Sequence, residues 1–504
     1  MSQTITKTDR PPYGILAVLM IGAFITFLNN TLLNIALPSI MKDLQVEPAT
    51  AQWLATGFML VSGILIPTTA FLIQKYSVRN LFLAAMAFFT IGSILAGFAH
   101  AFPLLLAGRM IQASGSAIIM PLLMNVMLTS FPVEKRGAAM GIFGLVLMGA
   151  PAIGPTLSGW IVEHYDWRML FHFVTPIAVI VLLIGFFLLK DKKVKVDVTL
   201  DIFSVLLSSV GFGGLLYGFS SAGSKGWDDP QVYGTITVGL ISLVWFILRQ
   251  LNMDRPMLNF RIFKYPMYAL SASISMVVTM AMFSGMLLLP IYVQMIKGIT
   301  PLDAGLLMLP GAILMAVMSP ITGKFFDRFG GRLLAIIGLS ITVVTSFYFS
   351  KLTMETTYNQ LMILYSVRMF GFSMIMMPIS TNGLNQLPAR YYPHGTAMNN
   401  TLQQVSGAIG TAILVTIMSN RSKSAATDIA TEEMKKIVGQ PTPEALALIK
   451  QQVMMKAMLE GINYAFFVSI FIALLALVLA FFIKRAKQAE DIIEEKPALK
   501  QIAN

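Results

Sequence analysis

The sequence predicts an all-α membrane protein of about fourteen transmembrane helices, built as two six-helix bundles with two further helices inserted between them. The 504 residues are 56% hydrophobic and only 12% charged, and a soluble domain cannot bury so much apolar surface. Apolar runs of about 20 residues, the length that crosses hydrocarbon roughly 30 Å thick, recur from Tyr13 to Lys484. The same landmarks also occur twice along the chain, at a nearly constant spacing.

This internal repeat divides the chain into two halves. The spacing is 259, 257 and 258 residues for three pairs, which are Arg109 and Arg368, Pro121 and Pro378, and Gly137 and Gly395. So constant an offset indicates duplicated six-helix bundles, here residues 13–189 and 266–484. Residues 201–250 form the two inserted transmembrane helices. Residues 420–458 are a polar insert, in which we expect a short extracellular amphipathic helix, and residues 485–504 are a cytoplasmic tail.

Lysine and arginine gather in alternate loops between the apolar runs. The loop after residue 189 holds Lys190, Lys192, Lys193 and Lys195, whereas the short loops of the other set hold single basic residues. By the positive-inside rule both termini are cytoplasmic, in a multi-pass protein of a bacterial plasma membrane. Topology also explains the net charge of +12, so we expect no nucleic-acid partner. The first apolar run has no small-residue cleavage site after it and is predicted to be a retained helix.

Motifs for metal binding, nucleotide binding and catalysis are missing from the sequence. There is no cysteine, and the four histidines are scattered. No G-x-x-x-x-G-K-[ST] phosphate loop, G-x-S-x-G elbow or H-E-x-x-H pair occurs. We therefore expect no metal, no cofactor and no enzymatic activity.

A charged turn joins two spans and reads Gly323-Lys-Phe-Phe-Asp327-Arg328-Phe-Gly330-Gly331-Arg332. So tight a turn needs glycine, and Asp327 is placed to face the positive N-terminal end of the next helix while the arginines meet neighbouring helix ends. The segment resembles the signature loop of the major facilitator superfamily, which clamps the cytoplasmic helix ends together. The resemblance implies a conformational gate made of Gly323, Asp327, Arg328, Gly330 and Arg332. The first-half counterpart, residues 74–79, lacks the acidic residue and the glycine and fits an ordinary charged turn.

Small residues and prolines mark the fifth span, which reads Gly149-Ala-Pro151-Ala-Ile-Gly154-Pro155-Thr-Leu-Ser-Gly159. Pro151, Pro155 and Gly159 recur every four residues, so one helix face is small, kinked and open to a close neighbour. The segment resembles the antiporter motif of the drug and metabolite exporters of the superfamily. That resemblance implies outward transport and a place for these residues in the gate. A generic packing face is the alternative interpretation.

The first span reads Leu28-Asn29-Asn30-Thr31-Leu-Leu-Asn34-Ile-Ala-Leu37-Pro38. It resembles the L-D-x-T-x-x-N-x-A-L-P motif of the fourteen-span drug:proton antiporters of the QacA/EmrB type. With Trp167-Arg168 and the 6+2+6 layout, the resemblance covers nearly the whole chain, reads closest to the lincomycin-resistance type and implies the major facilitator fold. Asn29 occupies the position that is usually acidic. Because an amide cannot carry a proton, the first-span proton site is missing here.

Two arginines lie inside predicted spans. Arg109, followed by Gln112, matches the family arginine thought to serve proton transfer, and Arg368 is its counterpart in the second half. A guanidinium at membrane depth is costly unless it is paired. Either both arginines are satisfied by backbone carbonyls and by Asn or Gln side chains, or they give the cavity a positive potential that favours anionic or zwitterionic amphiphiles.

Proton coupling then requires another carboxylate, because no Asp or Glu lies near the middle of a predicted span. The candidates are Glu163 and Asp166 at the outer end of the fifth span, Asp303 at the outer start of the tenth, and Asp327 on the inner side. Glu163 and Asp303 are the preferred ones. A purely structural charge at the membrane interface is the alternative for each.

The resemblance also implies a cavity lined by the first, fourth, ninth and twelfth spans. Its candidate residues are Asn29, Asn30, Asn34, Gln112 and Asn125 from the first half, and Met276, Met280, Met286, Gln294, Met374 and Met377 from the second. The 35 methionines of the chain supply flexible side chains that repack around dissimilar apolar ligands. Any single methionine can instead face lipid or fill the core.

The sequence therefore predicts a secondary exporter of small amphiphilic compounds, a multidrug efflux protein of the lipid bilayer that uses proton antiport. The alternative is a dedicated exporter of one endogenous lipid, peptide or metabolite, without strict proton coupling. Both predictions require two halves that rock about a central cavity and expose it alternately to each side.

Overall fold

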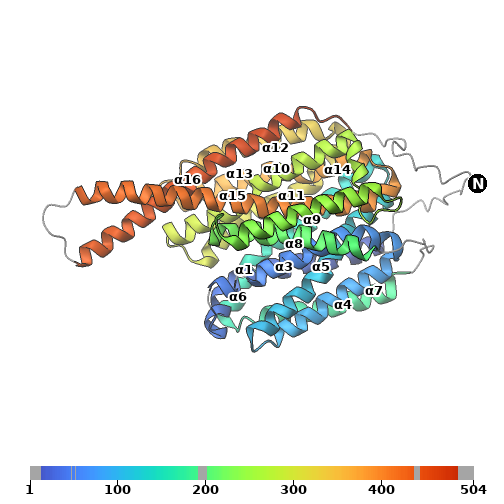
Figure 1. Ribbon diagram of the computed structural model, residues 1–504, viewed down its shortest axis with the longest axis horizontal. Helices are drawn as coiled ribbons and strands as arrows, with labels where there is room; N and C mark the ends of the chain where they lie inside the picture. Colours follow the sequence, from blue (N-terminus) through green and yellow to red (C-terminus); the bar gives the residue numbers. More distant parts are fainter. Residues whose placement is uncertain (1–12, 47, 52, 191–200, 436–442, 486–504) are drawn as a thin grey trace, which may run out of the picture.

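The computed structural model describes residues 13–46, 48–51, 53–190, 201–435 and 443–485. Long helices run side by side along the molecule, as Figure 1 shows. Thirteen helices within the described residues are long and apolar enough to cross a membrane. A further helix of 29 residues, α6 (Arg136–His164), lies where the sequence predicts the fifth span. The predicted all-α membrane fold is confirmed.

The first half supplies the helices up to residue 188. They are α1 (Tyr13–Leu44), α2 (Pro48–Ala51), α3 (Trp53–Lys75), α4 (Val78–Gly97), α5 (Phe102–Ser130), the 3-10 turn η1 (Val133–Lys135), α6 (Arg136–His164) and α7 (Met169–Leu188). The inserted pair follows as α8 (Ile202–Lys225) and α9 (Pro230–Asn252).

The second half begins after a linker that contains the 3-10 turn η2 (Phe260–Lys264). Its elements are α10 (Pro266–Ile291), the π-helical turn η3 (Tyr292–Ile296), α11 (Pro301–Phe329), α12 (Gly331–Phe349), α13 (Tyr358–Ser373), α14 (Met376–Gln386), η4 (Ala389–Tyr391), α15 (Tyr392–Lys435) and α16 (Pro443–Ala480).

Local sequence signals fix where several helices begin and end. The Ser77 hydroxyl accepts a hydrogen bond from the Asn80 amide at the start of α4, and Thr357 with Gln360 forms a capping box on α13. Gly330 separates α11 from α12 with φ +81°, a conformation that only glycine adopts without strain. The glycine expected in this turn is therefore required by the backbone.

Equivalent helix pairs in the two halves approach through glycines. A Cβ atom on Gly92 of α4 would lie 2.5 Å from the carbonyl oxygen of Gly108 on α5, and a Cβ on Gly338 of α12 would lie 2.5 Å from that of Gly371 on α13. Side chains are excluded at both crossings, so the backbones meet directly. Both helix pairs therefore use the same kind of glycine contact, at somewhat different positions along the helices.

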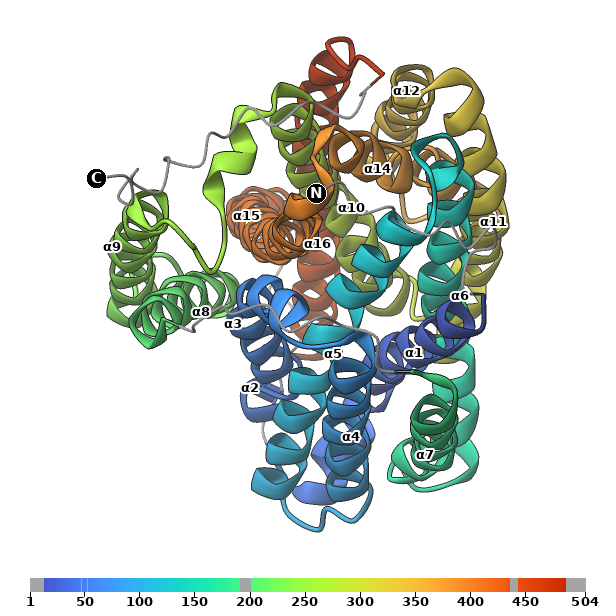
Figure 2. The ribbon, with the colours of Figure 1, turned by 90° about the vertical axis from the view of Figure 1, so that its right-hand side faces the viewer.

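The halves meet along two seams. In the first seam α6 packs against α11, and in the second α3 packs against α15. The inserted helix α8 contacts both α3 and α15, while α9 packs on α8 at the edge of the molecule (Figure 2). The inserted pair therefore covers the second seam and leaves the first uncovered.

The helix ends define two faces of the molecule. We call the face where α1 begins and α16 ends the terminal face, and the other the opposite face. Exposed basic side chains in the connections of the terminal face are Lys75, Lys135, Lys190, Arg255, Lys264, Lys324, Arg328, Arg332, Arg390, Lys484 and Arg485. The predicted charge asymmetry thus maps onto one face of the fold.

Residues 420–458 differ from the sequence prediction. Instead of a separate amphipathic helix, residues 420–435 continue α15 and residues 443–458 begin α16, and the two helices project past the others at the left of Figure 1. A Cβ on Gly461 would lie 3.2 Å from the Cβ of Ser422, and Arg421 pairs with Glu460 at 3.3 Å. Small residues let the extended helices pack on each other, and continuation satisfies the backbone hydrogen bonds.

Candidate functional site

The first seam depends on glycines along α6. A Cβ on Gly141 would lie 2.6 Å from the Ser319 carbonyl oxygen and 2.8 Å from the Pro320 Cα, and a Cβ on Gly144 would collide with the Ser319 side chain. Gly323 of α11 packs in the same way against the Gly137 carbonyl. The two backbones therefore touch across the halves, which makes the contact tight but free of large interlocking side chains.

Asp327 closes the terminal-face end of the first seam. Its Oδ1 accepts a hydrogen bond from the Gly137 amide and its Oδ2 one from the Ala138 amide, both at 2.8 Å. The carboxylate therefore caps the N-terminus of α6 in the other half, where the helix dipole favours negative charge. Asp327 does not face the following helix, as the charged turn predicts, because Gly330 turns the chain while the side chain stays on the face of α11 that meets α6.

The remaining gate candidates lie around this contact. Arg485, just beyond α16, donates from Nη2 to the Asp327 carbonyl oxygen at 2.6 Å and ties the end of the chain to the same turn. Arg328 and Arg332 are exposed on the terminal face, and the Arg328 guanidinium lies over the Phe329 ring at 5.2 Å. Asp327 is thus the member of the turn that bridges the halves.

The glycines of the fifth-span motif face two different partners. A Cβ on Gly154 would lie 2.9 Å from the Thr31 Cβ on α1, and one on Gly159 would lie 3.0 Å from the Leu302 side chain on α11. Gly149 has more space around it, because a Cβ there would lie 3.7 Å from the nearest atom, on the Phe24 ring. The small face predicted here holds α6 between α1 and α11. The side chains of Pro151 and Pro155 lie outside the described residues.

Arg109 is buried at the centre of the first half. Its Nη1 donates to Gln112 Oε1 at 3.0 Å, its Nη2 donates to Asn30 Oδ1 at 3.1 Å, and the guanidinium lies 4.5 Å from the centre of the Phe58 ring. Gln112 in turn donates to the Ser93 hydroxyl at 2.7 Å. The cation is therefore held by amide oxygens and an aromatic face, with no carboxylate among these partners.

Arg368 is buried in the equivalent place of the second half. It donates to the Ser346 hydroxyl on α12 at 3.0 Å and to the Ala281 carbonyl on α10 at 2.9 Å. The rings of Phe349 and Phe372 lie 5.6 Å and 5.5 Å from its guanidinium carbon. The hydrogen-bond partners described for the two arginines are amide oxygens, a hydroxyl and a backbone carbonyl.

The other amides predicted for the cavity are placed separately. Asn29 is buried on α1, and its Nδ2 atom makes no hydrogen bond in the described part of the chain. Asn125 is buried on α5, near Met124, whose sulfur accepts from Asn400 of α15 at 3.9 Å. The Asn34 side chain lies outside the described residues. Of these amides, Asn30 and Gln112 are the ones that the structure joins to Arg109.

A broken helix lies at mid-length of the span that carries Arg368. Helix α13 ends at Ser373 and α14 begins at Met376. Beside the break is a cavity of ≈ 10 Å³, lined by Ser373 and Met377 from the second half and by Gly144 from the first. Discontinuous helices near the midplane are where transporters bind their substrates. The space itself holds about one water molecule, so in this conformation it is too small for an amphiphile.

The methionines predicted for the cavity do not share one surface. Met377 lines the small cavity, and Met374 is buried beside the break. Met276 and Met280 are half-buried on α10, whereas Met286 and Gln294 are exposed. Of the predicted methionines, Met377 therefore lies at the junction of the two halves, against Gly144, whereas Met374 packs on Phe326 and Leu334 within the second half.

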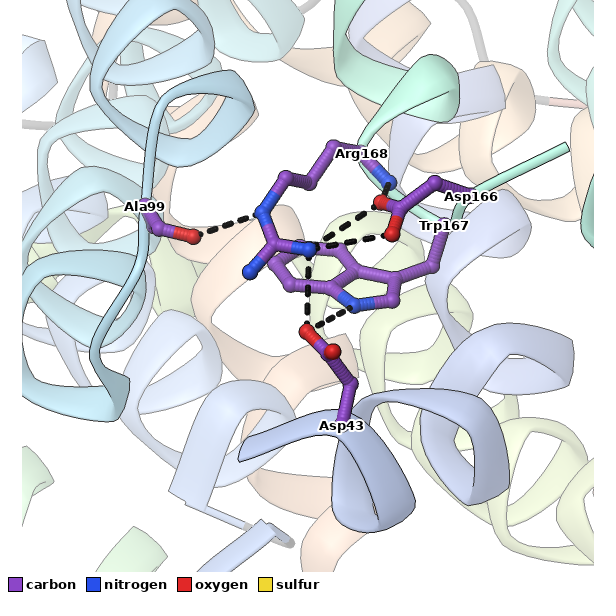
Figure 3. Close-up of polar contacts among 5 residues, drawn as sticks. All are labelled: Asp43, Ala99, Asp166, Trp167 and Arg168. Carbon is purple, nitrogen blue, oxygen red and sulfur yellow. Dashed lines mark hydrogen bonds and ion pairs between the residues drawn. The ribbon is translucent and has the colours of Figure 1, made fainter. Parts of the chain in front are cut away.

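The opposite face carries an ion-pair cluster within the first half (Figure 3). Arg168 bonds Asp43 at the end of α1 at 2.9 Å and Asp166 at 3.1 Å, and it donates to the Ala99 carbonyl at 2.8 Å. Trp167 Nε1 donates to Asp43 at 3.1 Å. This bond, with help from Arg168, lowers the pKa of the Asp43 carboxyl. Asp43 was missed because nothing in the sequence around Lys42-Asp43 indicates a partner more than 120 residues away.

The two preferred coupling carboxylates are exposed on the opposite face. Glu163 lies in the last turn of α6, and Asp303 lies in the first turn of α11. Asp303 accepts from the Thr300 hydroxyl at 2.8 Å, and its backbone amide donates back to that hydroxyl. Asp303 therefore completes a helix cap with Thr300.

Comparison with known proteins gives a consistent result. The sequence profile of the Major Facilitator Superfamily matches residues 19–411. The chain is 46% identical over 496 residues to the uncharacterized MFS-type transporter YcnB of Bacillus subtilis, covering 98% of this chain and 99% of that one. It is 42% identical over 475 residues to the lincomycin resistance protein LmrB of the same organism, covering 94% and 96%.

More distant relatives extend the match. The chain is 26% identical over 407 residues to the multidrug export protein EmrB of Haemophilus influenzae, covering 80% of each. Among solved structures, the human organic anion transporter MFSD10 (TETRAN) superposes with a TM-score of 0.64 at 14% identity, covering 94% of this chain and 100% of that one. At this identity the likeness shows the shared fold.

Proposed function

Because the chain belongs to the major facilitator superfamily of membrane transporters, we propose that it exports small amphiphilic compounds by alternating access, driven by proton antiport. The observation that carries this proposal is the way the halves meet. The first seam is closed by backbone contacts at glycines and by one carboxylate on a helix N-terminus. Such contacts can part and re-form without repacking either core, as a rocking movement requires.

Outward direction and broad specificity rest on further observations. Basic side chains gather on the terminal face, which supports a cytoplasmic placement of that face. The relatives named for lincomycin resistance and multidrug export support amphiphilic drugs as substrates. Met377, beside the broken helix, is an adaptable side chain at the place where the halves join.

The dedicated exporter without strict proton coupling remains a second candidate, and Asn29 favours it. No Asp or Glu occurs in α3, α4, α5 or α10, the acidic residue of α1 is Asp43 in its last turn, and Asn29 cannot hold a proton. The fully buried guanidinium groups of Arg109 and Arg368 donate hydrogen bonds to neutral partners. A coupling proton would then have to bind away from the span centres.

Transport by the purified protein in proteoliposomes separates these functions. The vesicles carry an imposed pH gradient, and the panel contains lincomycin with cationic, neutral and anionic amphiphiles of matched size. Gradient-dependent movement of several unrelated compounds, abolished when nigericin collapses the gradient, is the expected result. Movement of a single compound that survives nigericin supports the second candidate, and no movement of any compound contradicts both.

A further inference from the structure

The second seam contains a buried histidine that joins three parts of the chain. His394, near the start of α15, is only 5% exposed. Its Nε2 lies 3.1 Å from the Gln74 side-chain amide at the end of α3, in the other half. Its Nδ1 accepts from the backbone amide of Asn259 at 3.2 Å, in the linker that follows the inserted pair. The first half, the linker and the second half therefore meet on one imidazole.

These contacts fix the protonation state of the closed seam. A backbone amide can only donate, so Nδ1 must be unprotonated, and the single proton of the neutral ring lies on Nε2. The Gln74 Nε2 atom faces the ring and also donates to the Ala70 carbonyl at 3.0 Å. A half-turn of the amide brings its oxygen to the ring proton instead and gives up the bond to Ala70. An imidazolium would instead point a second N–H at the Asn259 N–H. The closed geometry thus accommodates the neutral form of His394 and opposes the charged one.

The inserted pair holds the Asn259 amide in place. Gln250 of α9 donates to the Ser204 hydroxyl on α8 at 2.6 Å, and its carbonyl oxygen accepts from the Leu258 amide at 3.1 Å. Gln250 is itself buried, and the Asn259 side chain accepts from the Arg261 amide at 3.0 Å. The residue that donates to His394 is therefore fixed on both sides to the inserted helices and the linker.

We propose that His394 is a proton-sensitive latch of the second seam, set by the inserted helix pair. The neutral ring holds α15 to α3 and to the linker while the terminal face is closed. When the seam opens, both ring nitrogens reach water and Nδ1 is free to take a proton, so acid on the terminal face favours the open state. The inference rests on the rocking movement of the proposed function, and it gives the inserted pair a part in that movement.

Neighbouring charges do not supply an alternative partner for the ring. The imidazole faces the neutral Gln74 amide from α3, the Asn259 backbone from the linker and, with ring centres 6.4 Å apart, the Tyr391 phenol from η4. Tyr268 of α10 donates to the next carbonyl, that of Gly395. The charged groups on the surrounding elements include Lys75 on α3, Arg136 on α6, Arg390 in η4 and, in the linker, Asp254, Arg255, Arg261 and Lys264. None of them has a hydrogen bond to the ring in the described part of the chain.

The expected size of the effect follows from ordinary histidine chemistry. A water-exposed imidazole titrates near pH 6.5. When the closed state binds no second proton, acid stabilises only the open state. Lowering the pH from 7.5 to 5.5 should then raise the ratio of open to closed seams by about tenfold.

The chain has no cysteine, so introduced cysteines are the only labelling sites. Exposed Lys75 and Arg390 flank the latch on α3 and η4, and we would place spin labels at Lys75→Cys and Arg390→Cys in the full-length protein in nanodiscs. Double electron–electron resonance then measures the distribution of distances between the two labels at pH 7.5 and at pH 5.5. We expect a longer-distance population that grows about tenfold relative to the short one. In His394→Gln, which keeps a neutral donor and acceptor but cannot be protonated, the distribution should not change with pH.

His164→Gln is the matched control, because this histidine is exposed on the opposite face and its pH response should equal that of the parent. A parent distribution that opens but is insensitive to pH, or a His394→Gln variant that responds like the parent, overturns the latch while leaving alternating access intact. A distance that stays short at both pH values in nanodiscs, and also in proteoliposomes with substrate and an imposed pH gradient, overturns the latch and the rocking movement together.

Discussion

Replacing Asp327 by asparagine should loosen the first seam by an amount that the geometry allows us to estimate. The carboxylate accepts two hydrogen bonds of 2.8 Å from the Gly137 and Ala138 amides and lies at the N-terminus of α6. Charge-assisted bonds contribute about 1.5–3 kcal/mol each, and the helix dipole adds roughly 0.3–1 kcal/mol. Asparagine keeps one acceptor oxygen and loses the charge, so the closed state should lose about 2–4 kcal/mol. The ratio of closed to open first seams then falls roughly 30- to 700-fold.

Labelling of a buried cysteine at the seam measures this shift. Ser319 is 4% exposed on α11, packs against Gly144 across the seam and is nearly isosteric with cysteine, so Ser319→Cys serves as the reporter. Under conditions in which the opening equilibrium of the first seam determines the rate of maleimide labelling, this rate should rise in Asp327→Asn by the factor given above for the ratio of closed to open seams. Asp303→Asn is the matched control, since it removes a carboxylate from the other end of the same helix. Equal rates in the parent and in Asp327→Asn, with thermal unfolding unchanged, would refute the assignment of Asp327 to the clamp.

Three further substitutions test other contacts. Gly141→Ala should slow transport and lower the unfolding temperature, because its Cβ would meet backbone atoms at 2.6 and 2.8 Å, an overpacking cost of about 1–3 kcal/mol. Gly149→Ala is the control and should be neutral, since its Cβ would lie 3.7 Å from the nearest atom. Equal behaviour of the two variants contradicts the packing argument. Asp43→Asn should lower the unfolding temperature at pH 7. The difference in unfolding temperature between parent and variant should shrink only below about pH 4, because stability from a depressed carboxyl pKa is lost as pH falls through that folded-state pKa. A difference that disappears nearer neutrality argues against the ion pair. Arg109→Lys should cost about 1–3 kcal/mol of stability and reduce transport, since an ammonium cannot reproduce the planar fork that reaches two amide oxygens on different helices. Unfolding and transport equal to those of the parent would contradict this assignment.

The architecture followed from the sequence because it depends on periodic or local features. Apolar runs of spanning length indicate helices whatever their neighbours are, and the offset of Arg109 and Arg368 indicates duplication before any contact is known. Gly330 was predictable for the same reason, since a tight turn between two long helices requires a positive φ. Features of this kind can be recognised from the residues themselves and from their spacing along the chain.

Contacts between distant segments were not predictable in this way. The charged turn draws attention to Asp327, but its partner is the start of α6, 190 residues earlier, and not the adjoining helix. His394 was noted only as a scattered histidine, because Gln74 lies 320 residues before it and Asn259 lies 135 residues before it. A single sequence gives the chemistry of each side chain but not the rotation of its helix or the register between two halves. These are the quantities that decide which candidate residues form a site.

The two seams differ chemically, and this difference has a consequence for how the terminal face opens. The first seam is closed by a carboxylate on two backbone amides, whereas the second is closed by an imidazole, whose ordinary pKa near 6.5 lies within the physiological range. A fall in pH on the terminal face therefore weakens the second seam. Because α8 contacts both helices of the second seam, opening there also has to move the inserted pair. We accordingly expect the halves to part first between α3 and α15, with the glycine-packed α6 and α11 as the axis about which they turn.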